Sequence, residues 1–181
     1  MSDLHNPTKV AAATGCPAAA VNANLELILT ALQNQGILSS NCAVAALATV
    51  AIETAHTFQP IHEFGDAAYF TQYDGRADLG NVNPGDGYLF RGRGFVQLTG
   101  RLNYTKYGAA LHLDLVGNPE LACEADNAAK IIAYYFYLHG TQTHADAGEW
   151  QQTRKDVNGG LGAWADYWSV VQKLLVLAGE N

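Results

Sequence analysis

The sequence has few cysteines, few basic residues and no long apolar run. The three cysteines, Cys16, Cys42 and Cys123, cannot all pair with one another, so we expect reduced thiols packed in helices. Ten basic residues against 17 acidic ones give a net charge of −7, which argues against the basic face that nucleic-acid binding needs. No run reaches the roughly 18 apolar residues of a membrane span, so no spanning segment is expected.

The first residues also lack the features of a secretory signal peptide. They read Met-Ser-Asp-Leu-His, with no basic segment followed by an apolar one. We therefore expect synthesis in a cytoplasm.

Two patterns that would indicate a metal or a cofactor are incomplete. The six histidines show no ligand spacing, and Asp66 stands where His62-Glu63 would need a second histidine to form a zinc motif. Gly92-x-Gly94 lacks the third glycine of a dinucleotide fingerprint. The sequence therefore predicts no metal site and implies no cofactor.

Apolar residues recur at helical spacing along most of the chain. At 181 residues with 49% apolar content we expect one domain, 1–181, with an N-terminal helical scaffold at 1–36 and a core at 37–178. Helices are predicted at about 7–14, 18–35, 40–56, 101–112, 128–138, up to 155, and 164–177. A short strand or ribbon is expected between Tyr69 and Gly75, and a polar connection at 141–151. The predicted fold class is mainly α.

The helix predicted from about Ser40 to His56 is apolar nearly all round, so we expect it to be buried in the middle of the domain. Glu53 lies in its last turn. Apolar neighbours and the negative end of the helix dipole both disfavour the ionised carboxylate, which suits a general acid near neutral pH. The alternative is that Glu53 merely emerges into solvent at the helix end.

A second carboxylate, Glu63, follows ten residues after Glu53 and can fold back across a cleft. Inverting glycosidases place two carboxyl groups roughly 6.5–9.5 Å apart, so that one protonates the leaving oxygen while the other activates water. We therefore assign Glu63 as the base. A solvated loop glutamate is the alternative, and the competing carboxylates are Asp66, Asp74 and Asp78.

The stretch 85–107 is the most basic part of the chain and is rich in hydrogen-bonding side chains. Gly92 and Gly94 allow the backbone to approach other groups closely. The polar side chains are Arg91, Arg93, Gln97, Thr99, Arg101, Asn103 and Tyr104. Such a segment suits a groove that binds a polar, uncharged polymer such as a glycan.

Three motifs carry a resemblance to a known family. Residues 92–99 read Gly-Arg-Gly-Phe-Val-Gln-Leu-Thr and are followed by Asn103-Tyr104, which resembles a signature of the family 19 glycoside hydrolases, the chitinases and phage-type endolysins. Ala51-Ile52-Glu53-Thr54 is similar to the family's His-Glu-Thr motif, with Ile52 where histidine is usual. Val157-Asn158-Gly159-Gly160 resembles its Ile-Asn-Gly-Gly motif. The matches follow the family's order over roughly residues 43 to 170.

The resemblance implies a lysozyme-like, two-lobed helical fold with a small loop or β-ribbon region beside the cleft. It also implies that a Thr99 hydroxyl helps to hold the attacking water, so the predicted catalytic residues are Glu53, Glu63 and Thr99. The predicted substrate-binding residues are Gln97, Asn103, Tyr104, Asn158 and Arg91. For Arg93, a structural role and a substrate contact both remain open.

The chain departs from the family at Asp166-Tyr167, where an arginine usually follows the aspartate, so a network from that arginine to the acids must be rebuilt or absent. The segment 73–81 is more similar to the bacterial and phage endolysin branch. The resemblance then implies a monomeric peptidoglycan hydrolase, made in a bacterial host's cytoplasm and acting on the β-1,4 bonds of the cell wall. A chitinase and a catalytically inactive glycan-binding protein are the alternatives.

Overall fold

The computed structural model describes residues 2–179, which divide into two compact units. The first unit combines the chain up to Gln59 with the chain from Ile132 onward, and the second is Pro60–Ile131. One long helix, α7 (Ala125–His139), contributes residues to both units. The fold is mainly α-helical, as predicted.

Helices make up the first unit. They are a 3₁₀ turn (Ser2–His5), α1 (Pro7–Thr14), α2 (Ala18–Asn34), α3 (Ser40–Glu53), the C-terminal part of α7, α8 (Thr141–Asp146), α9 (Trp150–Asn158) and α10 (Trp164–Ala178). The predicted boundaries of α1 are confirmed. The Asn6 side chain accepts hydrogen bonds from the first backbone N–H groups of the helix, and Gly15 ends it in the left-handed conformation.

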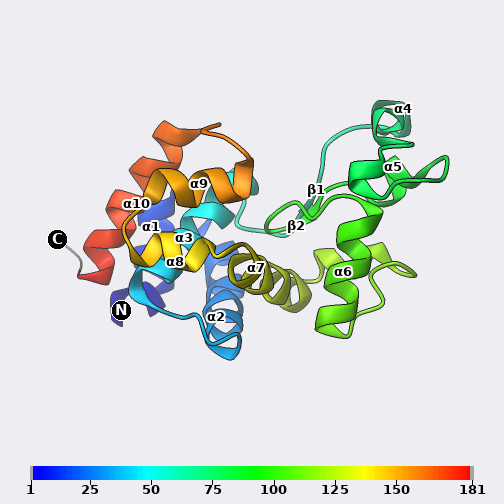
Figure 1. The fold of residues 1–181 in the computed structure, drawn as a ribbon. Coiled ribbons are helices and arrows are strands. Elements are labelled where there is room, and N and C mark those ends of the chain that lie inside the picture. Colours follow the sequence, from blue (N-terminus) through cyan, green and yellow to red (C-terminus); the bar gives the residue numbers. More distant parts are fainter. Residues whose placement is uncertain (1, 180–181) are drawn as a thin grey trace. The chain divides into compact units, whose positions relative to one another are not determined.

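The centre of the first unit is α3, as expected from its apolar sequence. Its residues from Cys42 to Ala51 are all buried, and it packs against α1, α2, α8, α9 and α10 (Figure 1). Alanines at many of its positions allow these helices to approach closely. The helix ends at Glu53 rather than at His56, because residues 55 and 56 take positive φ angles.

The second unit is built from short elements. They are β1 (Ile61–His62), α4 (Ala67–Phe70), 3₁₀ turns (Thr71–Tyr73, Ala77–Leu79 and Pro119–Cys123), α5 (Asp86–Leu89), β2 (Arg93–Gly94), α6 (Arg101–Leu111) and the N-terminal part of α7. The strands β1 and β2 pair antiparallel, with Ile61 opposite Gly94. This small ribbon places the residue that follows β1, Glu63, against the backbone that precedes β2.

Two local predictions are wrong. The segment from Tyr69 to Gly75 holds no strand; Asp66 caps a helical turn there by accepting from the Tyr69 N–H, and 3₁₀ structure follows. The expected polar connection at 141–151 contains α8, which begins directly after Gly140 and packs on α3. Its polar composition concealed the helix, although Thr141 and Ala145 are buried.

The cysteines are free thiols, as predicted. Cys16 and Cys42 are buried and Cys123 is partly buried, and burial raises the pKa of the Cys42 thiol to about 12. Within residues 2–179, no single helix is long and apolar enough to cross a membrane, whereas α1 and α2, bent by 111° at their junction, pass that test of length and composition as a pair.

Candidate active site

Glu53 is the last residue of α3, with a side chain that is 17% exposed. The turn that follows is fixed by Thr54, whose hydroxyl donates to the Val50 carbonyl at 2.7 Å and accepts from the Phe58 N–H at 3.0 Å. Phe58 itself is fully buried. Glu53 is therefore held where the core meets solvent.

A guanidinium lies against this carboxylate. Arg154 on α9 donates from Nη1 to Glu53 Oε1, and from Nε to the carbonyl of Gly162 at 2.8 Å. The Arg154 side chain is only 2% exposed, so water screens the ion pair little. Sequence reasoning considered only apolar neighbours and the helix dipole around Glu53. Arg154 is an additional charge beside Glu53 that this reasoning did not include.

Tyr167 stands where the family usually has an arginine, so that arginine cannot contact the acid in this chain. The Tyr167 ring is buried and lies 5.6 Å from the Arg154 guanidinium carbon, within the range of a cation–π contact. An arginine of α9 therefore contacts Glu53 in this chain. The available sequence signal was an arginine one helical turn before Asn158, and it was missed.

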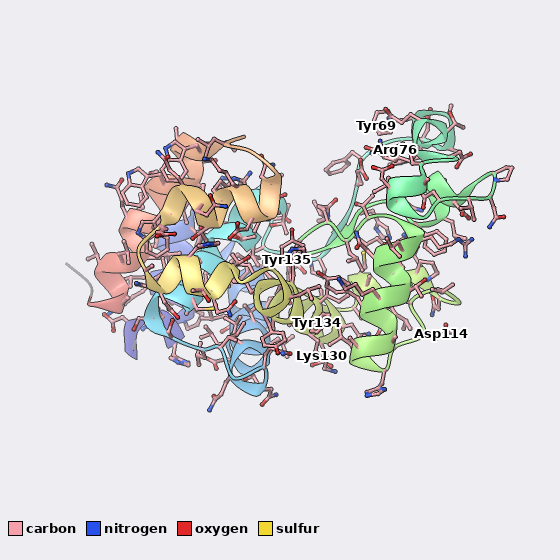
Figure 2. The ribbon with its side chains drawn as sticks, in the orientation of Figure 1. Tyr69, Arg76, Asp114, Lys130, Tyr134 and Tyr135 are labelled. Carbon is pink, nitrogen blue, oxygen red and sulfur yellow. The ribbon has the colours of Figure 1, made fainter. Side chains whose placement is uncertain are left out.

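Tyr135 lies on the C-terminal part of α7 (Figure 2) and donates to the backbone carbonyl of Asp156 at 2.8 Å. Burial, together with the nearby carboxylates of Asp156 and Glu53, raises the pKa of Tyr135 to about 12. This phenol therefore stays a neutral donor at ordinary pH. The Asp156 carboxylate is itself paired with His144 at 2.7 Å.

In the second unit, Glu63 is held by two donors. Its Oε2 accepts from the Gly92 N–H at 3.0 Å, and its Oε1 accepts from the Tyr73 hydroxyl at 3.2 Å. Its own N–H donates to the Gly92 carbonyl at 2.8 Å. Burial and the adjacent Glu63 carboxylate raise the pKa of Tyr73 to about 12, so Tyr73 remains a donor. Each oxygen of the Glu63 carboxyl group therefore has a donor that holds it in place.

The three competing aspartates have other partners. Asp74 accepts from the N–H groups of Gly85 and Gly87 at 2.9 and 2.7 Å. Asp66 caps α4, and Asp78 pairs with Arg76, which Figure 2 labels near Tyr69. Each of these carboxylates supports local backbone or an exposed ion pair, and the assignment of Glu63 as the base stays a prediction.

Gln97 adopts a positive φ of 55°, a conformation that side-chain-bearing residues rarely take. Its Nε2 donates to the carbonyls of Ile61 and Gly94, both at 3.2 Å. A Cβ added to Gly92 would stand 2.8 Å from Gln97 Oε1 and 3.1 Å from Glu63 Oε2. Gln97 and Glu63 therefore converge on Gly92, and only glycine leaves room for both.

Thr99 and Asn103 continue this polar chain. The Thr99 hydroxyl donates to the Gln97 carbonyl, and Asn103 Nδ2 donates to the Thr99 carbonyl, both at 2.8 Å. Both residues are partly exposed. The second unit thus links three predicted site residues, Gln97, Thr99 and Asn103, to one another through backbone groups.

Tyr104, which we expected to bind substrate, is fully buried. Its hydroxyl donates to the Arg91 carbonyl at 2.8 Å and accepts from Arg93 Nη1 at 3.0 Å. Because the ring has no exposed surface, the structure corrects its assignment: Tyr104 positions the backbone at Arg91 and the side chain of Arg93.

The two arginines of this stretch differ. Arg93 is 2% exposed and donates to Glu120 at 2.8 Å and to the Leu89 carbonyl at 2.9 Å, so the open question about it is answered in favour of a structural role. The Arg91 side chain is 14% exposed and its guanidinium carbon lies 4.2 Å from the Tyr88 ring centre. Arg91 remains a substrate-binding candidate.

A cavity of about 430 Å³ opens beside Glu63, a size typical of ligand sites. Phe64, which is 80% exposed, and Arg91 are among the residues that line it. The full lining is Pro60, Ile61, His62, Glu63, Phe64, Gly65, Tyr88 and Arg91. One predicted catalytic residue and one predicted binding residue therefore share a cavity within the second unit.

Asn158 ends α9 in the first unit and is exposed. Its Oδ1 accepts from the Gly162 N–H at 3.1 Å, while Arg154 binds the Gly162 carbonyl. Glu53, Arg154 and Asn158 thus belong to one unit, and the remaining site residues to the other. In the described part of the chain, no three His, Cys, Asp or Glu side chains gather as metal ligands would.

Comparisons with known proteins agree with the motif resemblance. No protein-family model matches the sequence. A glycosyl hydrolase family 19 domain-containing protein of Haemophilus influenzae is 29% identical over 105 residues, 58% of this chain and 50% of that protein. A basic endochitinase of Brassica napus is 30% identical over 106 residues, 54% of this chain and 38% of the relative. The chain therefore spans half or less of these curated relatives.

Solved structures extend the likeness to the fold. Chitinase C from Streptomyces griseus superimposes with a TM-score of 0.74 at 18% identity, covering 97% of this chain and 93% of that one. A bacterial family 19 chitinase gives a TM-score of 0.73 at 20% identity, covering 98% and 96%. The predicted resemblance to family 19 and the lysozyme-like helical fold are thereby confirmed.

Proposed function

We propose that the protein is a glycoside hydrolase that cleaves β-1,4 bonds in a glycan containing N-acetylglucosamine. The support is the fold, the motif matches, and relatives that are named as family 19 glycosyl hydrolases or chitinases. The peptidoglycan of a bacterial cell wall is the proposed substrate, and the protein is proposed to act as a monomer without a cofactor.

The observation that carries the proposal is that Glu53 and Glu63 are each held by a specific set of partners and both keep some exposure. Glu53 meets Arg154, and Glu63 meets Gly92 and Tyr73. Carboxylates fixed in different environments are what a two-carboxylate glycosidase uses for its acid and its base.

In the proposed reaction Glu53 gives its proton to the glycosidic oxygen as the bond from that oxygen to the anomeric carbon breaks. Arg154 stabilises the carboxylate that Glu53 then becomes. Glu63 takes a proton from water, whose oxygen forms the new bond to the anomeric carbon, and the Thr99 hydroxyl orients that water.

Each unit contains residues that we propose to bind sugar. Gln97, Asn103 and Arg91 belong to the second unit, and Asn158 belongs to the first. Arg91 brings a cation beside the cavity at Glu63, where it can donate to sugar hydroxyl and acetamide oxygens.

Peptidoglycan is placed before chitin because residues 73–81 resemble the endolysin branch of the family. We accordingly propose synthesis in a bacterial host's cytoplasm and action on the cell wall. Chitin is the second candidate, because the relatives from Brassica napus and Streptomyces griseus are named chitinases.

The test is a digest of purified peptidoglycan and of chitin oligomers, beside a Glu53→Gln control, with the new reducing ends identified by mass spectrometry. Muramic acid at those ends establishes a muramidase, and cleavage of chitin alone establishes a chitinase. Removal of the acid is expected to lower turnover by roughly 10²–10⁴-fold. If the wild-type protein cleaves neither polymer, the hydrolase proposal fails and a glycan-binding protein takes its place.

A further inference from the structure

All three tryptophans of the chain line one cavity in the first unit. Trp150 begins α9, and Trp164 and Trp168 lie one turn apart at the start of α10. The cavity measures about 440 Å³, within the range of sites for small molecules. Its lining includes none of Glu53, Arg154 and Asn158.

The rings form an aromatic wall. Trp164 and Trp168 stack at an interplanar angle of 11° with centroids 5.7 Å apart, and Trp150 lies 6.5 Å from Trp168 at 43°. All three side chains keep partial exposure. Tryptophans of a soluble protein normally bury their large apolar faces in the core, so three that border one open cavity indicate a surface built for contact.

Polar groups surround this wall. Three exposed polar side chains line the same cavity: the acidic Glu149, the basic Lys155 and the neutral amide Gln151. Within residues 2–179, the three indole N–H groups have no protein hydrogen-bond partner, and none of them is buried. The cavity therefore offers apolar ring faces beside unpaired donors and has no strong net charge.

We propose that this cavity, which neither Glu53 nor Glu63 lines, is a second glycan-binding site that holds a β-1,4-linked N-acetylglucosamine chain. Such a sugar has an apolar ring face of axial C–H groups that stacks on indole, and equatorial hydroxyl and acetamide groups that reach the surrounding polar side chains. A neutral polymer also matches a cavity with one acidic and one basic side chain. The choice of this glycan rests on the proposed function.

The site would keep the protein on an insoluble polymer. Two sites on one chain turn the second binding event into an intramolecular one, so overall attachment exceeds the affinity of either site alone. Loss of the tryptophan site should therefore reduce action on insoluble polymer more than cleavage of short soluble oligomers.

Intrinsic tryptophan fluorescence reports on this cavity alone, because the chain has no tryptophan elsewhere. The Glu53→Gln variant is titrated with N-acetylglucosamine oligomers, with peptidoglycan-derived muropeptides and with an α-1,4-linked glucose oligomer. We expect a saturable change in emission with the first, the second or both, at a dissociation constant on the order of 1 mM or tighter, and none with the glucose oligomer. Comparison of the N-acetylglucosamine oligomers with the muropeptides shows whether the site takes its sugar from chitin or from peptidoglycan.

Sedimentation with insoluble chitin and peptidoglycan provides a second measurement. We expect Trp150→Ala to weaken binding by about tenfold, as removal of a central aromatic contact does, and Trp150→Phe to keep most of it. Tyr137→Ala, which removes a 53% exposed aromatic ring from α7, is the matched control. Should Trp150→Ala unfold the protein, the comparison of Trp150→Phe with wild type in the titration still tests the site.

Three results would each overturn the proposal. The first is an emission spectrum that no glycan changes, and the second is a Trp150→Ala variant that sediments like wild type. The third is an emission change with the glucose oligomer equal to that with the others. Hydrolysis is measured separately on soluble oligomers. Cleavage of these oligomers without any change in tryptophan emission refutes the second site and leaves the proposed function intact. A change in emission without cleavage refutes the proposed hydrolase and leaves the second site intact.

Discussion

The guanidinium of Arg154 donates a hydrogen bond to the carboxylate of Glu53 from 101 positions further along the chain. Arg154 also holds the Gly162 carbonyl, so one side chain ties the end of α3 to the loop after α9. In the proposed hydrolase this makes Arg154 a positioning residue for the acid.

Substitution Arg154→Met should destabilise the protein by about 3 kcal/mol, because it leaves the Glu53 carboxylate without its buried partner. Urea unfolding measures the loss. A double variant with Glu53→Gln should recover part of it, since the uncompensated charge is then gone. Lys130→Met, which breaks an exposed ion pair with Asp126, is the matched control and should cost less than about 1 kcal/mol.

The same Arg154→Met variant should also lower kcat of cleavage, because the acid loses the hydrogen bond that positions it. Release of reducing ends under conditions where the variant is fully folded measures the rate. An unchanged kcat together with reduced stability would show that Arg154 supports the fold only.

Glu63→Gln should lower turnover by roughly 10²–10⁴-fold while leaving the thermal midpoint near that of wild type. With its oxygen toward the Gly92 N–H, the amide can donate from its NH2 group to the Tyr73 oxygen, but it cannot take a proton from water. Release of reducing ends measures the rate. Near wild-type turnover would transfer the role of base to another carboxylate, of which Asp66, Asp74 and Asp78 are the neighbours in sequence.

Gly92→Ala should separate activity from folding. The added methyl group would meet Gln97 Oε1 at 2.8 Å and Glu63 Oε2 at 3.1 Å, so the side chains must move even though the backbone angles there are ordinary. We expect a loss of about 10²-fold in kcat, since small displacements of catalytic groups are that costly. Gly160→Ala is the control, because nothing lies within 4 Å of its added carbon.

A histidine near the end of α3 should make stability depend on pH. His56 binds Asp166 through Nε2 and the Thr14 carbonyl through Nδ1, both at 2.9 Å. The hydrogen bond to Asp166 raises the pKa of His56 above 6.5, against smaller opposing effects of burial and Lys173. The stabilisation is therefore complete below pH 6.5 and is lost as pH rises through the raised pKa.

The effect is small because the His56 side chain is 35% exposed, so we expect less than about 1 kcal/mol. Chemical unfolding at pH 5.5 and pH 8.5, beside His56→Gln, measures it. Equal pH dependence in both proteins would contradict the assignment. Asp166→Asn should remove most of the same dependence, because it removes the anionic partner.

The helices of the first unit follow from local pattern. Asn6-Pro7 and Gly15 define α1 because capping and left-handed φ depend on neighbouring residues only. The apolar run of α3 likewise determines its burial. α8 escaped prediction because its six residues are mostly polar, and its packing against α3 is a tertiary effect.

The sequence by itself determined the candidate acid and base and the polar stretch around Gln97 and Thr99, because those motifs are contiguous in the chain. Tertiary structure alone decided which neighbours these groups have. In the folded protein Tyr104 is buried and Arg154 donates a hydrogen bond to Glu53. The three tryptophans line one cavity. The physical reason is that charge pairing, burial and ring stacking depend on distance in space, and residues far apart in sequence become neighbours only when the helices pack.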